Sequence, residues 1–393
     1  MAEVQKVVPP GGEEELRNAP PWASWLPTVR MTLLSILVAL FFGAILIAIS
    51  DPRVVEADSL GAALKGIVQA VGGSYWALLT GAVGSWDAIG NTLVKAAPLI
   101  CAGLGVTLAF RAGLFNIGAQ GQLVLGAIFA GYVGFHWHLP AGIHVIAAIL
   151  AGMLGGALWG GLAGWLKART GAHEVITTIM LNYIAFFALA YLLSVKGFQA
   201  PPYGQAISNP VDHNAQLFPL FGSTMRVHAG LFVALLAAAL TWWLLKYSRL
   251  GFRLRAVGAN PFAARTAGMS VERSYTTVML LAGALSGLAG VSQILGTNTQ
   301  VTQDIDAGIG FDAITVALLG RANPIGIVFA GLLFGALHAG GTQMQSYTPI
   351  DLVAVIQSLI VLFIAAPAVI RSIYRIKTSD AGVGSELAKG WNG

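Results

Sequence analysis

Long apolar stretches, each separated from the next by a short polar segment, dominate the chain from residue 30 onward. A helix needs about 20 apolar residues to cross a bilayer. The pattern therefore predicts an all-α polytopic membrane protein with about ten transmembrane helices. The predicted ranges are 30–50, 90–110, 117–135, 142–166, 174–195, 228–246, 275–296, 309–320, 325–341 and 350–370. The eighth is too short to cross alone, so we expect a broken or re-entrant element there.

Composition supports the same class, because only 10% of the 393 residues are charged and the mean hydropathy is +0.73. Soluble domains carry about 25% charged residues. Residues 1–29 are polar and lack the cleavage pattern of a signal peptide, so they predict a disordered cytoplasmic tail before a retained first span. Residues 30–371 would form one transmembrane domain, and 372–393 a cytoplasmic C-terminal tail. The single cysteine, Cys101, allows no disulfide within the chain.

Basic residues between the stretches predict the topology. With the N-terminus inside, most of them fall on one side, and the other side holds Arg53, Lys65, Lys95, Lys196 and Arg226. The inner set is Arg17, Arg30, Arg111, Lys167, Arg169, Lys246, Arg249, Arg253, Arg255, Arg265, Arg273, Arg321, Arg371, Arg375 and Lys377. The positive-inside rule then places both termini in the cytoplasm. The net charge of +5 reflects this arrangement, and we expect no nucleic-acid partner.

Glycine recurs every four residues in the 142–166 stretch, at Gly152, Gly156, Gly160 and Gly164. This spacing places the glycines on one helical face, where a neighbouring backbone can approach closely. We interpret the face as a packing surface.

Two segments on the outer side leave alternatives open. The first, 60–85, is partly apolar and is an interfacial amphipathic piece or a re-entrant half-helix. The second, 196–228, is rich in Pro, Asn and Gly, and forms either an ordered external cap or a simple connector.

A polar break, FRAGLFNIGAQGQ, interrupts the apolar pattern at residues 110–122. Arg111 marks the cytoplasmic end of one span, and Gly113 permits a turn. Irregular backbone is tolerated at membrane depth only where protein or water satisfies its polar groups. We therefore expect residues 116–122 to turn toward a cavity, with Asn116 either facing solute or capping the next helix.

The catalytic sequence motifs tested are incomplete or absent in this chain. The segment HEVIT at 173–177 begins like a zinc-protease motif, but Thr177 stands where the second histidine must be. No Gly-Lys dipeptide occurs, which excludes a Walker A loop. His136 and His138 flank Trp137 and read as interfacial anchors. We predict a protein that is not an enzyme and has no metal or cofactor.

Polar positions deep in the apolar stretches are mostly neutral amides and hydroxyls. They are Asn116, Gln120, Gln122, Thr177, Thr178, Asn182, Gln293, Asn298, Thr315 and Gln357, with Asp312 as the main ionisable exception. Such a lining suits an uncharged polar solute and offers no obvious driving ion. The energy source should then be another polypeptide. The predicted path residues are Asn116, Gln120, Gln122, Asn182, Asn298, Asp312 and Thr315, with at most one of the two glutamines pointing inward.

The largest cytoplasmic loop, 247–274, contains a short predicted helix. Asn260 is a plausible N-cap, Pro261 suits the first helical position, and Gly268 can end the helix. A basic loop held at lipid headgroups is one interpretation. A rigid helix with a protruding Phe262, offered to a cytosolic protein, is the interpretation that we favour.

These residues resemble a known family. FAARTAG, residues 262–268, keeps the Ala-Ala-x-x-x-Gly spacing of the coupling loop of ABC importer permeases. The segments GLFNIGAQGQLVLGA, EVITTIMLNYIA and GFDAITVALLGRANPIG look like the permeases of ribose and branched-chain amino-acid importers, most of all the nucleoside subgroup. The resemblance spans residues 90–370 and implies a type II ABC importer-like fold in the inner membrane.

The resemblance also implies partners. They are a cytosolic ABC ATPase, a second permease that is identical or related, and an extracytoplasmic solute-binding protein. The coupling residues would be Asn260, Pro261, Phe262, Ala263, Ala264, Arg265 and Gly268. The chain departs from the family pattern at two positions. Phe262 replaces an acidic residue, and His173 stands where Asn is expected beside Glu174.

We therefore expect ATP-driven movement of the 260–268 helix to rock the bundle between outward-facing and inward-facing states. Purine nucleosides, pyrimidine nucleosides and simple sugars stay open as solutes. One rival is an ion-driven transporter centred on Asp312 with Asp304 or Asp306. A second is an intramembrane enzyme, for which His173, Glu174 and Asp312 would have to converge.

Overall fold

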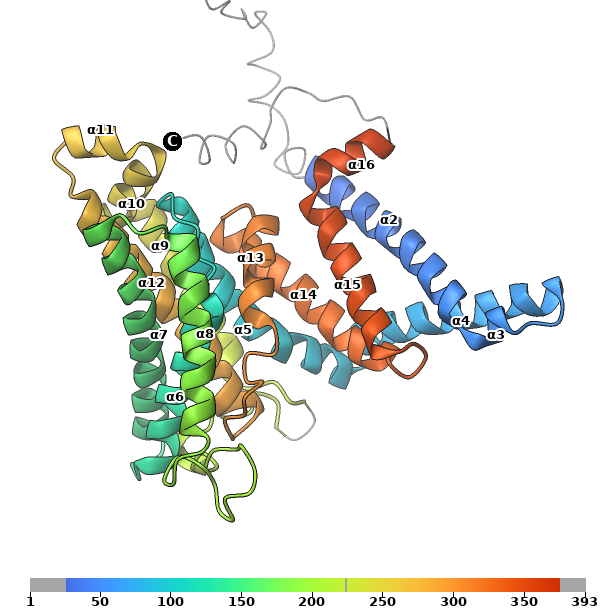
Figure 1. The fold of residues 1–393 in the computed structure, drawn as a ribbon, viewed down its shortest axis with the longest axis horizontal. Helices are drawn as coiled ribbons and strands as arrows, with labels where there is room; N and C mark the ends of the chain where they lie inside the picture. Colours follow the sequence, from blue (N-terminus) through green and yellow to red (C-terminus); the bar gives the residue numbers. More distant parts are fainter. Residues whose placement is uncertain (1–25, 223–224, 375–393) are drawn as a thin grey trace, which may run out of the picture. The chain divides into compact units, whose positions relative to one another are not determined.

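The computed structural model describes residues 26–222 and 225–374, and within these ranges the regular structure is helical (Figure 1). The helices are α2 Leu26–Ser50, α3 Pro52–Val55, α4 Leu60–Val83, α5 Trp86–Arg111, α6 Ala119–His136, α7 Ile143–Thr170, α8 Glu174–Leu192, η2 His213–Ala215, α9 Gly230–Tyr247, α10 Arg249–Ala259, α11 Pro261–Thr266, α12 Val271–Ser292, η3 Gln293–Thr297, α13 Ile309–Leu319, α14 Pro324–Met344, α15 Ile350–Ala365 and α16 Pro367–Ile373. The predicted tails up to residue 25 and from 375, with Arg17, Arg375 and Lys377, lie outside the described residues.

Each of the ten predicted apolar ranges coincides with a helix. Seven helices of the described residues are long and apolar enough to cross a membrane: α2, α5, α7, α8, α9, α12 continued by η3, and α14. The other three ranges form α6, with 18 residues, and the shorter α13 and α15. The short eighth range is thus confirmed as α13. The 60–85 segment forms α4, one continuous helix of 24 residues.

The described helices form two compact units, and the single transmembrane domain expected over residues 30–371 stays a prediction. The first unit holds α2, α3, α15, α16 and the start of α4. Within it the rings of Phe42 and Phe363 stack at 5.7 Å, and Asp51 caps α3 and pairs with Arg53 at 2.8 Å. The second unit runs from Val68 to Ile350 and contains the remaining helices.

Close contact between α7 and α12 forms the tightest part of the second unit. A Cβ on Gly156 would overlap the Gly283 carbonyl, and one on Gly164 would lie 2.7 Å from Met279 Cβ. Gly152 packs instead on Val291 and Gly287, so the two helices run antiparallel. The predicted packing role of the four-residue glycine repeat is confirmed.

Helix α5 is the central helix of the second unit, since it contacts α9, α12, α13 and α14. Gly331 and Gly335 of α14 lie against Ile100 and Ala96 of α5, where added side chains would clash.

The described residues of the 196–228 loop, 196–222 and 225–228, form an ordered layer and not a simple connector. Phe198, Val211 and Leu217 are buried in the same hydrophobic cluster as Ile294 and Val301. The backbone N–H groups of Ser208, Val211 and Leu217 donate to the carbonyl oxygens of Val301, Thr299 and Leu295, at 2.8–2.9 Å. The loop is therefore fixed to the segment that follows α12.

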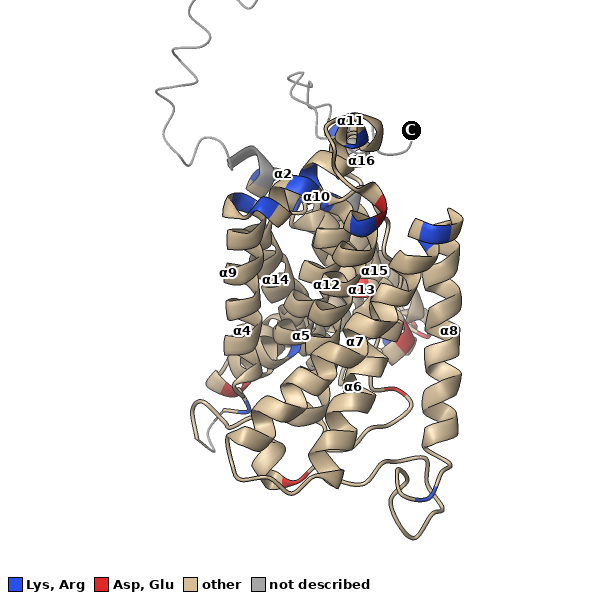
Figure 2. Ribbon diagram, turned by 90° about the vertical axis from the view of Figure 1, so that its left-hand side faces the viewer, with Lys and Arg blue, Asp and Glu red and all other residues tan. Residues whose placement is uncertain are grey.

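Basic side chains gather at one end of the second unit, where α5, α7 and α9 finish (Figure 2). Arg111, Lys167, Arg169 and Lys246 occupy the last turns of these three helices. Cations at helix C-termini also interact favourably with the helix dipole. The charge asymmetry expected from the sequence is present within this unit.

Candidate functional site

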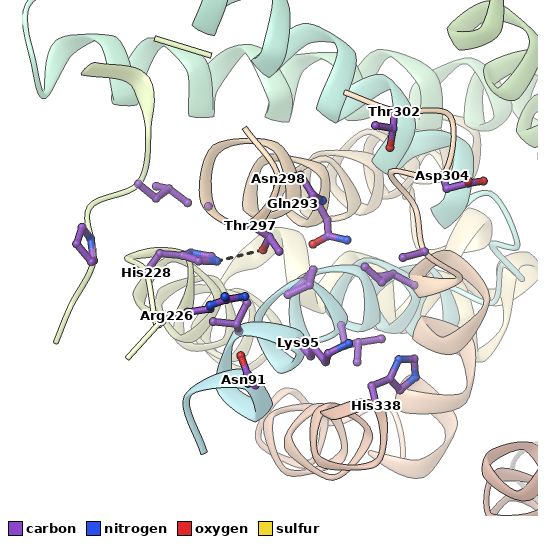
Figure 3. Close-up of a pocket in the computed structure, with 18 residues that line it drawn as sticks. Asn91, Lys95, Arg226, His228, Gln293, Thr297, Asn298, Thr302, Asp304 and His338 are labelled. Carbon is purple, nitrogen blue, oxygen red and sulfur yellow. Dashed lines mark hydrogen bonds between the residues drawn. The ribbon is translucent and has the colours of Figure 1, made fainter. Parts of the chain in front are cut away.

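A cavity of about 670 Å³ in the second unit lies beside the first half of α5. Its walls come from α5, the 196–228 loop, η3, the 298–308 connector and α14. Figure 3 shows polar side chains from these elements around one space. They are Asn91, Lys95, Arg226, His228, Gln293, Thr297, Asn298, Thr302, Asp304 and His338.

A π-helical turn shapes one wall of the cavity. Helix α12 widens into η3 at Gln293–Thr297, and the Asn298 N–H donates back to the Gln293 carbonyl at 2.8 Å. The buried Gln293 side chain donates from Nε2 to the Ile305 carbonyl at 3.3 Å. Such turns recur at functional sites because they displace side chains from regular helical positions. Here the turn exposes Thr297 and Asn298.

His228 is a neutral hydrogen-bonding group at the cavity. Its Nδ1 accepts from the Gly230 N–H at 3.1 Å, and Nε2 lies 3.4 Å from Thr297 Oγ1 (Figure 3). Burial lowers the pKa of His228 to about 4. An Nδ1 that accepts a hydrogen bond carries no proton, which agrees with that shift. The proton is therefore on Nε2, from which it is donated toward Thr297.

Two cationic side chains and one carboxylate line the cavity. Lys95 lies on the third turn of α5, is half-buried, and forms no ion pair with any described residue. Arg226 comes from the 196–228 loop and Asp304 from the connector. A half-buried lysine without a partner keeps its three N–H donors available. Lys95 can therefore donate to a bound solute.

A side-chain contact between α13 and α14 adjoins the cavity. His338 Nε2 lies 3.0 Å from an Asp312 carboxylate oxygen, and His338 itself lines the cavity. Asp312 was predicted as a path residue. It contacts His338, which lines the cavity, but it is not itself a lining residue. Asn298 lines the cavity directly, and Thr315 is a partly buried residue of α13.

Three other predicted path residues meet in a buried network away from this cavity. Asn116 Nδ2 and Gln122 Nε2 each donate to the other's amide oxygen at 3.1 Å, and the Gly118 N–H donates to Asn116 Oδ1. Asn182 accepts from the Gly121 N–H and donates to the Ile117 carbonyl at 3.0 Å. The amides thus satisfy the irregular backbone before α6, and their contact with solute stays a prediction.

Gln120, the remaining predicted path residue, is partly buried and lies against the start of α13. Its Cα and Cβ pack on Gly310, and its side chain lies near the Asp306 carboxylate. Asp306 also accepts from the N–H groups of Gly308 and Gly310, at 3.1 and 3.0 Å. Asp306, named in the ion-driven alternative, is thus used to anchor the first turn of α13.

Replacing Asn116 with Leu should lower the stability of the protein. The change leaves the Gln122 amide and the Gly118 N–H without their partner, at a cost of about 1–3 kcal/mol for each buried group. We expect a lower melting temperature in a thermal-unfolding assay. Asn298→Leu is the control, because Asn298 is exposed at the cavity. Unchanged melting combined with lost uptake would instead make Asn116 a solute contact.

The predicted helix in the 247–274 loop is present as α11. Asn260 Oδ1 accepts from the Ala263 N–H at 3.0 Å, Pro261 is the first helical residue, and Gly268 ends the helix with a φ of +81°. These capping assignments are confirmed. Phe262 is 79% exposed, whereas Ala264 is buried.

Packing beneath α11 joins three helices. Ala264, Val257 of α10 and Val271 of α12 form a small hydrophobic cluster. Arg265 pairs with Glu272, which fixes the helix from the other side. At the end of α10, Gly258 lies against the Arg111 and Ala112 backbone. Arg111 Nε in turn donates to the Ala322 carbonyl at 2.8 Å. The α11 helix is thus connected to the end of α5.

Sequence reasoning did not predict most of the polar cavity residues as path residues, among them Lys95, His228 and His338. Lys95 was counted only among the basic residues of the outer side, and the structure places it on the third turn of α5, which begins at Trp86. His338 lies inside an apolar stretch, and its pairing with Asp312 was a signal available from two ionisable residues in neighbouring spans. Glu174, whose role was uncertain, pairs with Lys167 at 2.6 Å and accepts from the Phe115 N–H. In the described part of the chain, no three His, Cys, Asp or Glu residues cluster as metal ligands.

The amino-acid sequence of this chain is similar to those of known proteins. Residues 88–365 match the family described as the permease component of the branched-chain amino acid transport system. The guanosine ABC transporter permease protein NupP of Bacillus subtilis is 38% identical over 322 residues, which is 80% of this chain and 92% of that protein. The glucose ABC transporter permease protein TsgB13 of Haloferax volcanii is 38% identical, with coverages of 70% and 75%. The nucleoside ABC transporter permease protein NupB of Lactococcus lactis is 34% identical, with coverages of 78% and 88%.

No solved structure matches the chain. The family match covers most of the second unit, including the cavity and the α10–α11 region. The apolar helices that surround these sites are those of a multi-pass membrane protein. The chain therefore belongs to the permease component family of the branched-chain amino acid transport system, and it is a membrane transport subunit and not an enzyme.

Proposed function

We propose that this chain is the permease subunit of an ABC importer that moves nucleosides across the inner membrane. The cavity of about 670 Å³ is the observation on which the proposal rests. Pockets for small organic ligands have volumes of about 300–1,000 Å³. Asn298, Thr297 and Gln293 offer amides and a hydroxyl to ribose, and Lys95 offers donors to acceptor atoms of a base.

Simple sugars are the second candidate solutes. The glucose permease TsgB13 supports them, whereas NupP and NupB, which are named for guanosine and nucleosides, support the first proposal. NupP also shares a longer part of its length with this chain than TsgB13 does. Both solute classes present hydroxyl groups, so the amides of the cavity serve either.

Uptake by the complete transporter in proteoliposomes tests the proposal. We expect ATP-dependent uptake of labelled guanosine, with competition by other nucleosides and little competition by glucose or ribose. Strong competition by sugars alone would support the second candidate. Solute movement by the permease alone under a proton or sodium gradient would contradict both and favour the ion-driven alternative.

Coupling to ATP hydrolysis would start at α11. Residues 260–268 offer the exposed Phe262 to an ATPase subunit, and the packing of Ala264 makes the helix follow α10 and α12. The contact of Gly258 with the end of α5 supports transmission along α5 toward Lys95 and the cavity. Rigid elements with two packing arrangements are what such coupling requires. Asn116, Gln120, Gln122 and Asn182 would adjust the path at the break before α6.

The partners follow from this mechanism. They are a cytosolic ATPase, a second permease and an extracytoplasmic solute-binding protein that delivers nucleosides to the cavity. Bacillus subtilis has two guanosine permeases, NupP and the less similar NupQ, which supports a related second permease. The basic end of the second unit would face the cytoplasm with both chain termini.

Replacing Lys95 with Met should slow solute uptake in an otherwise folded permease. Loss of a charged hydrogen bond to the solute costs about 1.5–3 kcal/mol, which corresponds to at least about tenfold in rate. The measurement is the initial uptake rate at saturating binding protein. Lys65→Met is the matched control, because Lys65 is exposed on α4. Equal rates in both variants would remove Lys95 from the path.

A further inference from the structure

One corner of the second unit, where α9 meets α10, combines cations with exposed aromatic side chains. We define the α9–α10 corner as Trp242, Lys246, Tyr247, Arg249, Phe252 and Arg253. Lys246 Nζ lies 5.1 Å from the Trp242 ring centroid and 5.3 Å from that of Tyr247. Tyr247 and Phe252 are about 60% exposed. Aromatic and basic side chains in this combination are typical of the boundary between hydrocarbon and lipid headgroups.

Helix α10 runs along that boundary. Helix α9 ends at Tyr247, and Ser248 caps α10 by accepting from the Gly251 N–H at 2.9 Å. Gly251 packs on the Leu244 carbonyl of α9, while Gly258 packs on the backbone at the end of α5. Because α10 bridges the ends of two helices at the same face of the unit, it lies across that face and does not continue into solvent.

Charge at the corner is uncompensated. Residues 230–271 contain no Asp or Glu. Arg249 and Arg253 are four residues apart on one face of α10, both are exposed, and neither pairs with a carboxylate among the described residues. Figure 2 shows Lys and Arg, in blue, in the region of α9 and α10. Arg265, in contrast, pairs with Glu272 beneath α11.

We propose that the α9–α10 corner is a binding site for an anionic phospholipid, with the headgroup phosphate on Arg249 and Arg253 and the acyl chains beside Phe252 and the α9 aromatics. A guanidinium binds phosphate oxygens through two parallel N–H donors, and an aromatic side chain at the interface lies against the upper acyl chain. The basic loop thus serves two partners, a lipid at α10 and a protein at α11. The inference does not depend on which solute is transported.

Native mass spectrometry of the full-length purified chain tests the site. The probes are phosphatidylglycerol and phosphatidylcholine with identical acyl chains. Near a membrane surface, each basic residue contributes about fivefold to the binding of anionic lipid. We therefore expect the wild-type chain to prefer phosphatidylglycerol, and the double variant R249Q/R253Q to bind it about 25-fold more weakly.

Two further variants make the result decisive. K65Q/K196Q removes the same charge elsewhere and should keep the preference, and R249K/R253K keeps the charge and should retain most of the binding. A preference that survives R249Q/R253Q overturns the proposal, as does an equal loss in K65Q/K196Q. If R249Q/R253Q kept its lipid binding but no longer associated with the ATPase, the corner would be a contact for the protein partner. That result would also overturn the proposal. Thermal unfolding of each variant verifies that the fold is intact.

Discussion

ATP-driven uptake should be lost when Phe262 is replaced with Asp, although the permease stays folded. Phe262 projects from α11 with 79% of its surface exposed, so its replacement removes little internal contact. An aromatic anchor buried in a protein interface contributes about 2 kcal/mol or more, and a charge in its place must also be desolvated. We expect the uptake rate to fall by at least about thirtyfold. We also expect less of the ATPase subunit to co-purify with the variant. Proteoliposome uptake and affinity pull-down measure the two effects.

Thr266→Asp is the control for the Phe262 variant. Thr266 lies on the same short helix and is also exposed, so the variant introduces the same charge one turn away. We expect it to retain most of the coupling. If the Phe262 variant kept both uptake and ATPase association, the assignment of α11 as the coupling helix would be wrong.

The variant Gly156→Leu should prevent the permease from folding. Any side chain at this position meets the Gly283 carbonyl and the Gly287 backbone, so α7 and α12 would have to separate. Overpacking of a core costs about 1–3 kcal/mol even where side chains can move aside, and backbone cannot move aside as easily. We expect the folded fraction in size-exclusion chromatography to fall sharply and the melting temperature of any remainder to drop.

Gly72→Leu is the matched control for the packing variant. Gly72 lies within α4, and a Cβ there meets no atom within 4 Å. This variant should behave like the wild-type chain. Equal losses in both variants would mean that leucine at a helical glycine is harmful in general. The folding defect could then not be attributed to the α7–α12 contact.

The transmembrane helices and α11 could be predicted because their signals are local. Apolar runs of about 20 residues can be satisfied in a bilayer only as helices, since the backbone must bond internally. Likewise Asn260, Pro261 and Gly268 act on the nearest peptide groups, so their order alone marks the start and the end of α11. The glycine repeat in α7 also predicted a packing face, though not its partner.

The cavity could not be predicted in the same way because its walls come from segments far apart in the chain. Lys95 and His338 line the same cavity only after α5 and α14 pack together. Sequence alone also could not tell which amides face solute. Asn116 and Gln122 look like ideal path residues, but the broken backbone before α6 needs their hydrogen bonds.

The sequence by itself determined the class of the protein, the helical spans, the distribution of positive charge and the capped helix at 260–268, because each depends on neighbouring residues or on the bilayer. Tertiary structure decided that α7 pairs with α12, that the 196–228 loop forms part of the cavity wall, and that Lys95 has no ion-pair partner among the described residues beside this cavity. These features depend on contacts between distant segments, and such contacts form only when the helices pack.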